Sequence, residues 1–500
     1  MKKSIALLVC LLLCVSVFLV ACGGDEDTSS QADNSKVIGG DNIEDYVDMP
    51  EFVWKGQSGY ETFNVCITSD ETAGTYYCED VVPDLYTTTD QALNTAVTKR
   101  NDQIFNKYGV EIVGVPVANV AEAVRMDVSS ALNEYDAALP YMSAAATLAQ
   151  EGFLYDLYDF KEYIHFDQPW WDSKAEKALT VGGKLYFTTG DITIMTKIVS
   201  FAMTFNKEML KKVAPDYDIY QSVRDGEWTF DKLVELSTLA TADSDGVAGM
   251  SENDTWGLSS SYSDTSVFYL GSGNNYVAKN SDDLPELMIG SNESSVSAAV
   301  KVLDALQLTD SWVFHCDTLD SSIRWNVSLD VFGQNRCLFR TSAFSAIKKL
   351  RAYVDAQEFG IVPVPKLYET QDDYYTYCNC SYSFCAVIPT SLNEYDAQFS
   401  AYMLDLMAFG GMKHITPAYY ETTLKYRDLR DEDSGEMLDK YIFNNVVYDL
   451  GNIYNFGGVQ NLVVGLMTSK TNNVASTIEA NKEVIENAIK ECIEAYDLDE

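Results

Sequence analysis

The sequence predicts an α/β fold, and two observations carry this prediction. Strand-like apolar runs alternate with amphipathic helical segments along the chain, as in α/β domains. The chain has 500 residues, 12% of them aromatic, so the part beyond residue 50 can bury enough apolar surface for two domains. No internal repeat is visible in the sequence. We therefore expect a body of two α/β domains.

The first elements of this body follow from local sequence patterns. Strands are predicted at 63–68 (FNVCIT), 110–117 (VEIVGVPV) and 136–141 (DAALPY), with a helix from about 90 to 108 between the first two. A second helix is predicted at 143–151, and Gly152 ends it because glycine readily adopts the left-handed conformation of a helix end.

Two later helices carry clear signals. The segment WTFDKLVELSTLA has Thr229 as a candidate N-cap and Asp231 in the first turn. Near the carboxyl end, apolar residues from Ile478 to Tyr496 recur at helical spacing. This stripe predicts a helix that packs against the body.

The amino terminus has the parts of a secretory signal. Two lysines precede the run from Ile5 to Ala21, in which only Ser16 is polar. The run is shorter than the roughly 20 apolar residues of a membrane-spanning helix. Residues 23–35 contain no Lys or Arg to stop translocation. We therefore expect residues 1–21 to be a signal peptide.

The residues Leu19-Val20-Ala21-Cys22-Gly23 resemble the lipobox of bacterial lipoproteins. The resemblance implies cleavage before Cys22 and acylation of its thiol, which would anchor the protein at the extracytoplasmic face of the cell membrane of a Gram-positive bacterium. The alternative is an ordinary signal peptide with a cysteine at its boundary. Residues 22–50 are polar and acidic, so we expect a disordered linker there.

The net charge limits the partners. The chain carries 75 acidic and 35 basic residues, a formal charge of −40. Such an anion is repelled by nucleic acid and by anionic lipid, so we expect no nucleic-acid partner. No Walker-type or dinucleotide-binding glycine motif is present. The charge therefore also disfavours nucleotides and sugar phosphates unless a local basic pocket intervenes.

The cysteines admit two interpretations. Export permits disulfides, and Cys66 could pair with Cys78 across a turn. The motif CNCSYSFC at 378–385 could hold a metal ion, but none of the three histidines in the chain lies within 25 residues of it. We therefore favour buried or disulfide-bonded cysteines over a metal site.

Several segments, in order along the chain, resemble extracellular solute-binding proteins of ABC importers, of the large carbohydrate-binding type. They are LAQEGFLYDLYDF (148–160), PWWDSKAEKALTVGGKLYFTTGD (169–191), FNKEMLKK (205–212), DGEWTFDKLVEL (225–236), DTWGLS (254–259), DVFGQNRCLF (330–339), FGIVPVPK (359–366) and AYYETTLKYR (418–427). The resemblance implies a monomeric periplasmic-binding-protein-like fold (type II), in which a multi-strand hinge joins two lobes. It also implies a ligand cleft between the lobes, hinge closure, and delivery of the solute to membrane permease subunits.

The resemblance also places the lobes. The first lobe would comprise residues 50–190 and 341–392, and the second 191–340 and 393–500. The chain would cross between them near 187–195, near 337–345 and near 388–394.

A sugar site needs aromatic faces for stacking and carboxylates or amides for the hydroxyls. Because clefts form where lobes meet, we look for such residues in loops near the crossings. The candidates are Tyr141, Asp191, Phe268, Tyr269, Asn274, Asn275, Trp325, Tyr454 and Phe456. Core packing is the alternative for each aromatic residue, and it is the favoured role of Trp170 and Trp171.

The loop TADSDGVAGMSE resembles a calcium-binding loop. Thr241, Asp243, Asp245, Gly246 and Glu252 match its first, third, fifth, sixth and twelfth positions. Threonine is unusual at the first position, and the following residues indicate a turn and a strand rather than a second helix. We expect either a structural calcium ion or a solvated acidic turn, and no required cofactor.

Two other classes of protein remain as alternatives. A secreted, cell-surface glycoside hydrolase needs paired carboxylates, but with 75 acidic residues such a pair can always be found. No G-x-S-x-G or H-E-x-x-H motif is present, so we do not expect an enzyme. A non-catalytic adhesin or envelope scaffold would fit the anchor and the charge but not the order of the resembling segments.

Overall fold

Two separate β-sheets organise the body. The computed structural model describes residues 59–69, 80–83, 91–307, 312–350, 353, 358–420 and 431–496. The predicted signal peptide, Cys22, the acidic linker and Cys78 lie outside the described residues. None of the described helices is long and apolar enough to cross a membrane.

The first sheet has three parallel strands in the order β2-β1-β3. They are β1 (Thr62–Thr68), β2 (Glu111–Val117) and β3 (Ala137–Ala138), and the register pairs Val65 with both Gly114 and Ala137. Helix α3 (Gln91–Tyr108) links β1 to β2, and α4 (Val120–Ser130), capped by Asn119, links β2 to β3. Helix α5 (Met142–Gln150) follows and ends just before Gly152, whose φ is +75°. The predicted order of strands and helices is confirmed in this region.

The second sheet has five strands in the order β10-β4-β9-β5-β8. They are β4 (Phe201–Asn206), β5 (Trp256–Ser260), β8 (Val313–His315), β9 (Cys337–Ala343) and β10 (Phe359–Val362). Strand β5 is parallel to β8 and β9, whereas β4 is antiparallel to β9 and β10. The carboxyl ends of β5, β8 and β9 therefore meet at one edge of the sheet.

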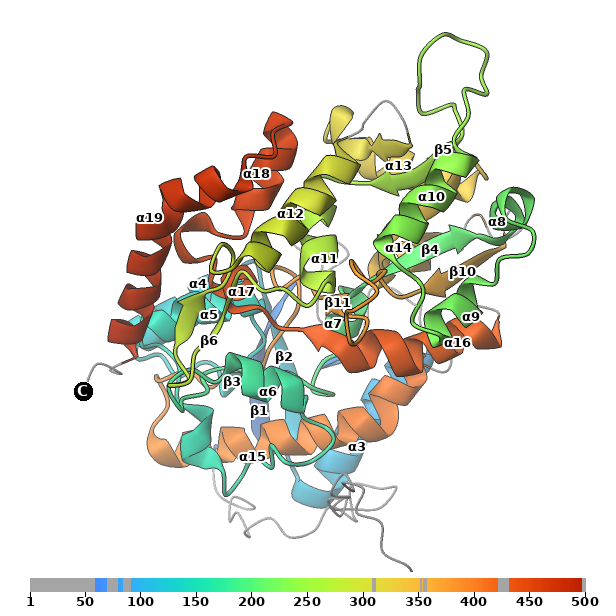
Figure 1. The fold of residues 1–500 in the computed structure, drawn as a ribbon. Helices are drawn as coiled ribbons and strands as arrows, with labels where there is room; N and C mark the ends of the chain where they lie inside the picture. The colour runs from blue at the N-terminus through green and yellow to red at the C-terminus, as the bar shows by residue number, and fades with distance from the viewer. Residues whose placement is uncertain are drawn as a thin grey trace, which may run out of the picture. The chain divides into compact units, whose positions relative to one another are not determined.

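Helices pack beside this second sheet (Figure 1). Helix α10 (Phe230–Ala240) begins at Thr229, whose hydroxyl accepts the Lys232 N–H at 3.3 Å, as predicted. It lies very close to β5: a Cβ added to Gly257 would be 2.2 Å from the Ser237 carbonyl oxygen. A glycine in the strand therefore permits this approach.

The remaining elements surround the two sheets. The helices are α6 (Ser173–Leu179), α7 (Met195–Ile198), α8 (Lys207–Val213), α9 (Ile219–Arg224), α11 (Asp264–Gly271), α12 (Glu293–Leu306), α13 (Arg324–Gly333), α14 (Phe344–Leu350), α15 (Glu394–Gly410), α16 (Glu432–Met437), α17 (Leu450–Tyr454), α18 (Asn461–Ser469) and α19 (Val474–Ala495). The short strands are β6 (Val277–Lys279), β7 (Pro285–Leu287), β11 (Thr376–Tyr377) and β12 (Val446–Val447). Helix α19 buries Ile478, Ile485 and Ile489, which confirms the predicted carboxyl-terminal stripe.

Two antiparallel chain segments connect the sheets. Residues 188–200 lead into β4, and residues 378–387 run back beside them, with bridges Ser200–Cys378 and Thr188–Ala386. The second segment continues to the first sheet through the bridge between Ala138 and Val387. We call residues 378–387 the joining segment. The first of these two segments overlaps the predicted crossing at 187–195.

The predicted crossing at 337–345 is wrong. These residues include β9, a central strand of the second sheet that is bonded to both β4 and β5. The chain returns through the joining segment, ahead of the expected 388–394. Strand β10 also pairs with β4, so residues 359–362 belong with the second sheet rather than with the first lobe.

Helix α15 also differs from the predicted division, which placed residues 393–500 in the second lobe. Phe399 packs edge-on against Tyr60 and Phe63 of the first sheet region, with ring centroids 4.8 and 5.8 Å apart. The helix is apolar on nearly every face, and most of its residues are buried. An apolar helix is stable only where it is enclosed, and here the first sheet and α3 help to enclose it.

Asp405 of α15 anchors the segment that contains Trp170 and Trp171. Its Oδ1 accepts both indole N–H groups, at 2.9 and 2.6 Å, and the backbone N–H of His165 at 3.1 Å. Its Oδ2 lies 2.9 Å from His165 Nδ1. Both tryptophans are buried. The structure thus gives them the packing role favoured from the sequence.

Replacing Asp405 should destabilise the fold. The change Asp405→Ala would leave two buried indole N–H groups without their acceptor, and each costs about 1–3 kcal/mol. We expect the free energy of unfolding to fall by about 3 kcal/mol, measured by urea denaturation and circular dichroism. The control Glu394→Ala removes an exposed carboxylate of the same helix and should change it by no more than about 0.5 kcal/mol. Equal losses in the two variants would contradict this role of Asp405.

Candidate ligand-binding site

A pocket of about 430 Å³ lies where β5 and β9 end. Its lining residues are rich in serine and come from both the second sheet and the joining segment; they are Phe201, Ser259, Ser260, Ser261, Ser263, Asp264, Trp325, Ser328, Leu329, Arg340, Thr341, Ala343, Ser345, Ala346, Lys349, Asn379 and Tyr382. We call it the serine pocket. Ligands of α/β proteins commonly bind at the carboxyl ends of parallel strands, as this position allows.

Asp264 organises one side of the pocket floor. It is the first residue of α11, and its carboxylate accepts the Ser260 hydroxyl at 2.8 Å, the Ser261 N–H at 2.8 Å and the Ser261 hydroxyl at 3.1 Å. Burial raises the pKa of Asp264 to about 6, although these hydrogen bonds and the charge of Arg340 favour the ionised form. The serines thus hold a buried acid in a fixed position.

Arg340 of β9 organises the other side. Its Nε donates to Ser328 Oγ at 3.1 Å, and its Nη1 donates to Ser342 Oγ at 2.8 Å. The Ser328 hydroxyl also lies 3.0 Å from that of Ser259 in β5. Because α13, β5 and β9 are tied together in this way, the polar floor is preorganised.

Two exposed aromatic side chains line the same pocket. Trp325 of α13 is 48% exposed and Tyr382 of the joining segment is 40% exposed. The Arg324 guanidinium lies 5.0 Å from the Trp325 ring centroid and is held by Asp317 at 2.9 Å. The pocket therefore offers aromatic faces above a floor of hydroxyls and charged groups.

Tyr141, a predicted candidate, supports this arrangement. Its ring stacks on Phe384 at 5.0 Å and meets Tyr382 edge-on at 5.8 Å. Of the predicted residues, Trp325 thus lines the pocket and Tyr141 packs behind its lining. The sequence analysis missed Tyr382, Asp264 and Arg340. A usable signal was the serine run that directly follows the buried Leu258 of β5.

Five other candidates are accounted for by core packing or local bonding. Phe268 and Tyr269 are buried in α11, and the Asn275 carbonyl accepts the Tyr269 hydroxyl at 3.3 Å. Asn274 donates its side-chain amide to Ser272 Oγ at 2.8 Å. Phe456 is buried. None of these residues lines the serine pocket.

Tyr454 is also engaged in packing. Its ring lies parallel to that of Phe456 with centroids 5.1 Å apart. Its hydroxyl lies 2.7 Å from the hydroxyl of Tyr496, just beyond α19. This aromatic loop therefore joins α17 to the carboxyl-terminal helix and does not line the serine pocket.

Asp191 lies in a second cavity, of about 480 Å³, which Trp170, Trp171 and Tyr448 also line. Its Oδ1 accepts hydrogen bonds from the Lys197 ammonium at 3.2 Å and from the Thr416 hydroxyl at 2.6 Å. The structure thus separates Asp191 from Trp325. The two tryptophans beside it are buried, so they offer little aromatic surface for stacking.

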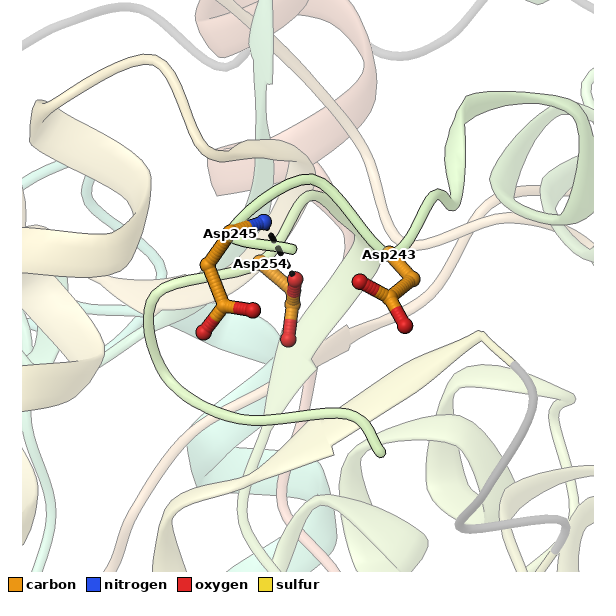
Figure 2. A group of neighbouring side chains, drawn as sticks. All are labelled: Asp243, Asp245 and Asp254. Atoms are coloured by element: carbon orange, nitrogen blue, oxygen red, sulfur yellow. Dashed lines mark hydrogen bonds between the residues drawn. The ribbon is translucent and has the colours of Figure 1, made fainter. Parts of the chain in front are cut away.

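The acidic loop has a different arrangement from the expected one (Figure 2). Carboxylate oxygens of Asp243, Asp245 and Asp254 lie within 4.8 Å of one another, and Glu252 is not part of this group. Asp254 accepts the N–H groups of Ser244, Asp245 and Ser251 at 2.7, 3.1 and 2.8 Å, which lower its pKa. The Thr241 hydroxyl bonds back to the Ser237 carbonyl at 2.8 Å. Calcium binding stays a prediction. The three grouped carboxylates do not follow the ligand spacing of the standard calcium-binding loop, because Asp254 takes part and Glu252 does not.

The three cysteines of the motif CNCSYSFC have separate backbone partners. Cys378, Cys380 and Cys385 are buried and free, and their thiols face the separate carbonyls of Thr196, Asn452 and Pro140. Burial raises the pKa of Cys378 to about 12, so its thiol stays protonated. Cys66 is buried and free in β1.

Comparison with known proteins shows similarity at the level of fold. No model of a known protein family and no curated protein matches the sequence. A cyclo/maltodextrin-binding protein solved with maltotetraose is 15% identical, with a TM-score of 0.55 over 87% of this chain and 99% of its own. The maltose-binding periplasmic protein MalE of Listeria monocytogenes, solved with maltose, is 15% identical, with a TM-score of 0.54 over 87% of this chain and 99% of its own. UspC of M. tuberculosis is 14% identical, with a TM-score of 0.54 over 85% of this chain and 100% of its own. The chain has the two-lobed periplasmic-binding-protein fold.

The buried acid of the serine pocket predicts a pH-dependent stability. Because the pKa of Asp264 is about 6 in the folded protein, against an ordinary value of 3.8, the stability that this group contributes is complete below about pH 4 and is lost as the pH rises through 6. Relative to Asp264→Asn, the wild type should lose up to about 3 kcal/mol of unfolding free energy between pH 4 and 7.

Urea denaturation across this pH range measures the difference. Asp282→Asn, which changes an exposed loop carboxylate, is the matched control and should follow the wild type. A difference between wild type and Asp264→Asn that does not vary with pH would show that Asp264 has an ordinary pKa.

Proposed function

We propose that this protein is an extracytoplasmic solute-binding protein of an ABC importer, which captures a carbohydrate in the serine pocket and delivers it to a membrane permease. The observation that carries the proposal is the pair of exposed aromatic residues, Trp325 and Tyr382, above a polar floor in this fold. The similar solved structures contain maltotetraose or maltose, which supports a sugar as the ligand.

The chemistry of the pocket suits a sugar. Aromatic faces pack against the apolar C–H faces of sugar rings, while hydroxyls, carboxylates and guanidinium groups bond the ring hydroxyls. Trp325 comes from the second sheet's helices, and Tyr382 comes from the segment that joins the sheets. A ligand held between them would favour a closed arrangement of the two lobes.

The lining also favours binding over hydrolysis. Glycoside hydrolases use a pair of carboxyl groups on either side of the scissile bond. Among the described residues that line the serine pocket, Asp264 is the only one with a carboxyl group. Three hydrogen-bond donors from Ser260 and Ser261 already bond this carboxylate. Nothing in this geometry supports the glycosidase alternative.

Trp325 and Tyr382 should both be needed for affinity. Once a thermal-shift screen of oligosaccharides has identified a ligand, Trp325→Ala and Tyr382→Ala should each weaken it about tenfold or more in calorimetric titration, because stacking area is lost. Tyr395→Ala is the control, since Tyr395 is 41% exposed but does not line the pocket. Unchanged affinity in both pocket variants would reject this site.

The lipobox-like segment supports a membrane anchor as part of the same proposal. Acylation of Cys22 would hold the receptor at the membrane, where the permease lies. Cys22→Ala should abolish incorporation of labelled palmitate and release the protein from cells. Cys14→Ala, within the same apolar run, is the control and should leave both unchanged. Continued labelling of the Cys22→Ala protein would refute the anchor.

A further inference from the structure

The serine pocket differs in charge from the chain that forms it. Acidic residues outnumber basic ones by 75 to 35 over the whole sequence. Among the described residues that line this pocket, the charged side chains are Arg340, Lys349 and Asp264. Two cations and one acid therefore meet in a pocket of a strongly anionic protein.

The two cations are held in different ways. The Arg340 guanidinium is buried and fixed by Ser328 and Ser342. Lys349 lies in the last turn of α14 with an exposed side chain, and no ion pair of Lys349 is found within the described residues. The pocket thus presents one rigid and one adaptable positive group.

Arg324 adds less positive charge than its position suggests. It lies against Trp325 at the pocket, but Asp317 pairs with it at 2.9 Å. The charge available to a ligand therefore comes chiefly from Arg340 and Lys349, with Asp264 opposing them.

We propose that the serine pocket selects an acidic oligosaccharide, one whose sugar units include a uronic acid. This inference rests on the proposed function, because it takes the serine pocket as the sugar site. The ring of the acidic unit would stack on Trp325 or Tyr382, and its carboxylate would bond Lys349 and lie in the field of Arg340. Charge-assisted hydrogen bonds to a carboxylate are stronger than those between neutral groups, whereas a neutral sugar gains little from two cations. A local positive pocket also offsets the repulsion that the rest of the chain exerts on an anion.

Matched sugars and matched variants test the proposal. Calorimetric titrations of the full chain would use oligouronates derived from galacturonate, glucuronate and mannuronate, each paired with its carboxyl-reduced, neutral form. We expect at least one acidic sugar to bind about tenfold or more tightly than its reduced form, with an affinity that falls as salt is added. Lys349→Gln should weaken the binding of the acidic sugar about fivefold or more, and should weaken the binding of the reduced form less. Lys212→Gln, which removes an exposed lysine remote from the pocket lining, is the control.

The outcomes separate this inference from the proposed function. Equal affinities for an acidic sugar and its reduced form, or an acidic-sugar affinity that Lys349→Gln leaves unchanged, overturn the inference. Binding of neutral oligosaccharides alone overturns it too, while the proposed function stands. If neither acidic nor neutral oligosaccharides bind the wild type, the proposed function fails and this inference fails with it.

Discussion

The antiparallel pairing of residues 188–200 with the joining segment is the constraint on which the rest of the structure depends. The bridges Ser200–Cys378 and Thr188–Ala386 hold two segments that run between the sheets side by side. The same joining segment carries Asn379 and Tyr382 into the serine pocket. One wall of the pocket is therefore part of the connection between the lobes, so contact with a ligand acts on that connection directly.

Polar groups replace apolar ones where the parallel strands of the second sheet end. Strand β5 passes from the buried Leu258 to Ser259 and Ser260, and the hydroxyls bond Ser328 and Asp264 instead of leaving unsatisfied buried groups. Arg340 of β9 likewise bonds neighbouring hydroxyls, those of Ser328 and Ser342. A floor built from mutually bonded side chains needs little rearrangement when a ligand arrives, which is the condition for tight and selective binding.

The sequence predicted the local elements well because their signals are local. Thr229 capped its helix as expected, and the strand and helix order around β1 and β2 was correct. The lobe boundaries differed because strand pairing is a long-range property: nothing near residues 337–345 indicates that β9 lies between β4 and β5. The chemistry that a sugar site requires indicated aromatic residues but could not separate Trp325, which is exposed, from Phe268, which is buried.

The contrast between Trp325 and the other tryptophans has a spectroscopic consequence. Trp170, Trp171, Trp228, Trp256 and Trp312 are all buried, so among the described tryptophans Trp325 alone is exposed. Among the described rings, we therefore expect Trp325, which lines the serine pocket, to emit at the longest wavelength and to be the most readily quenched. A ligand that covers this ring in the serine pocket should therefore change the intrinsic emission without any attached label.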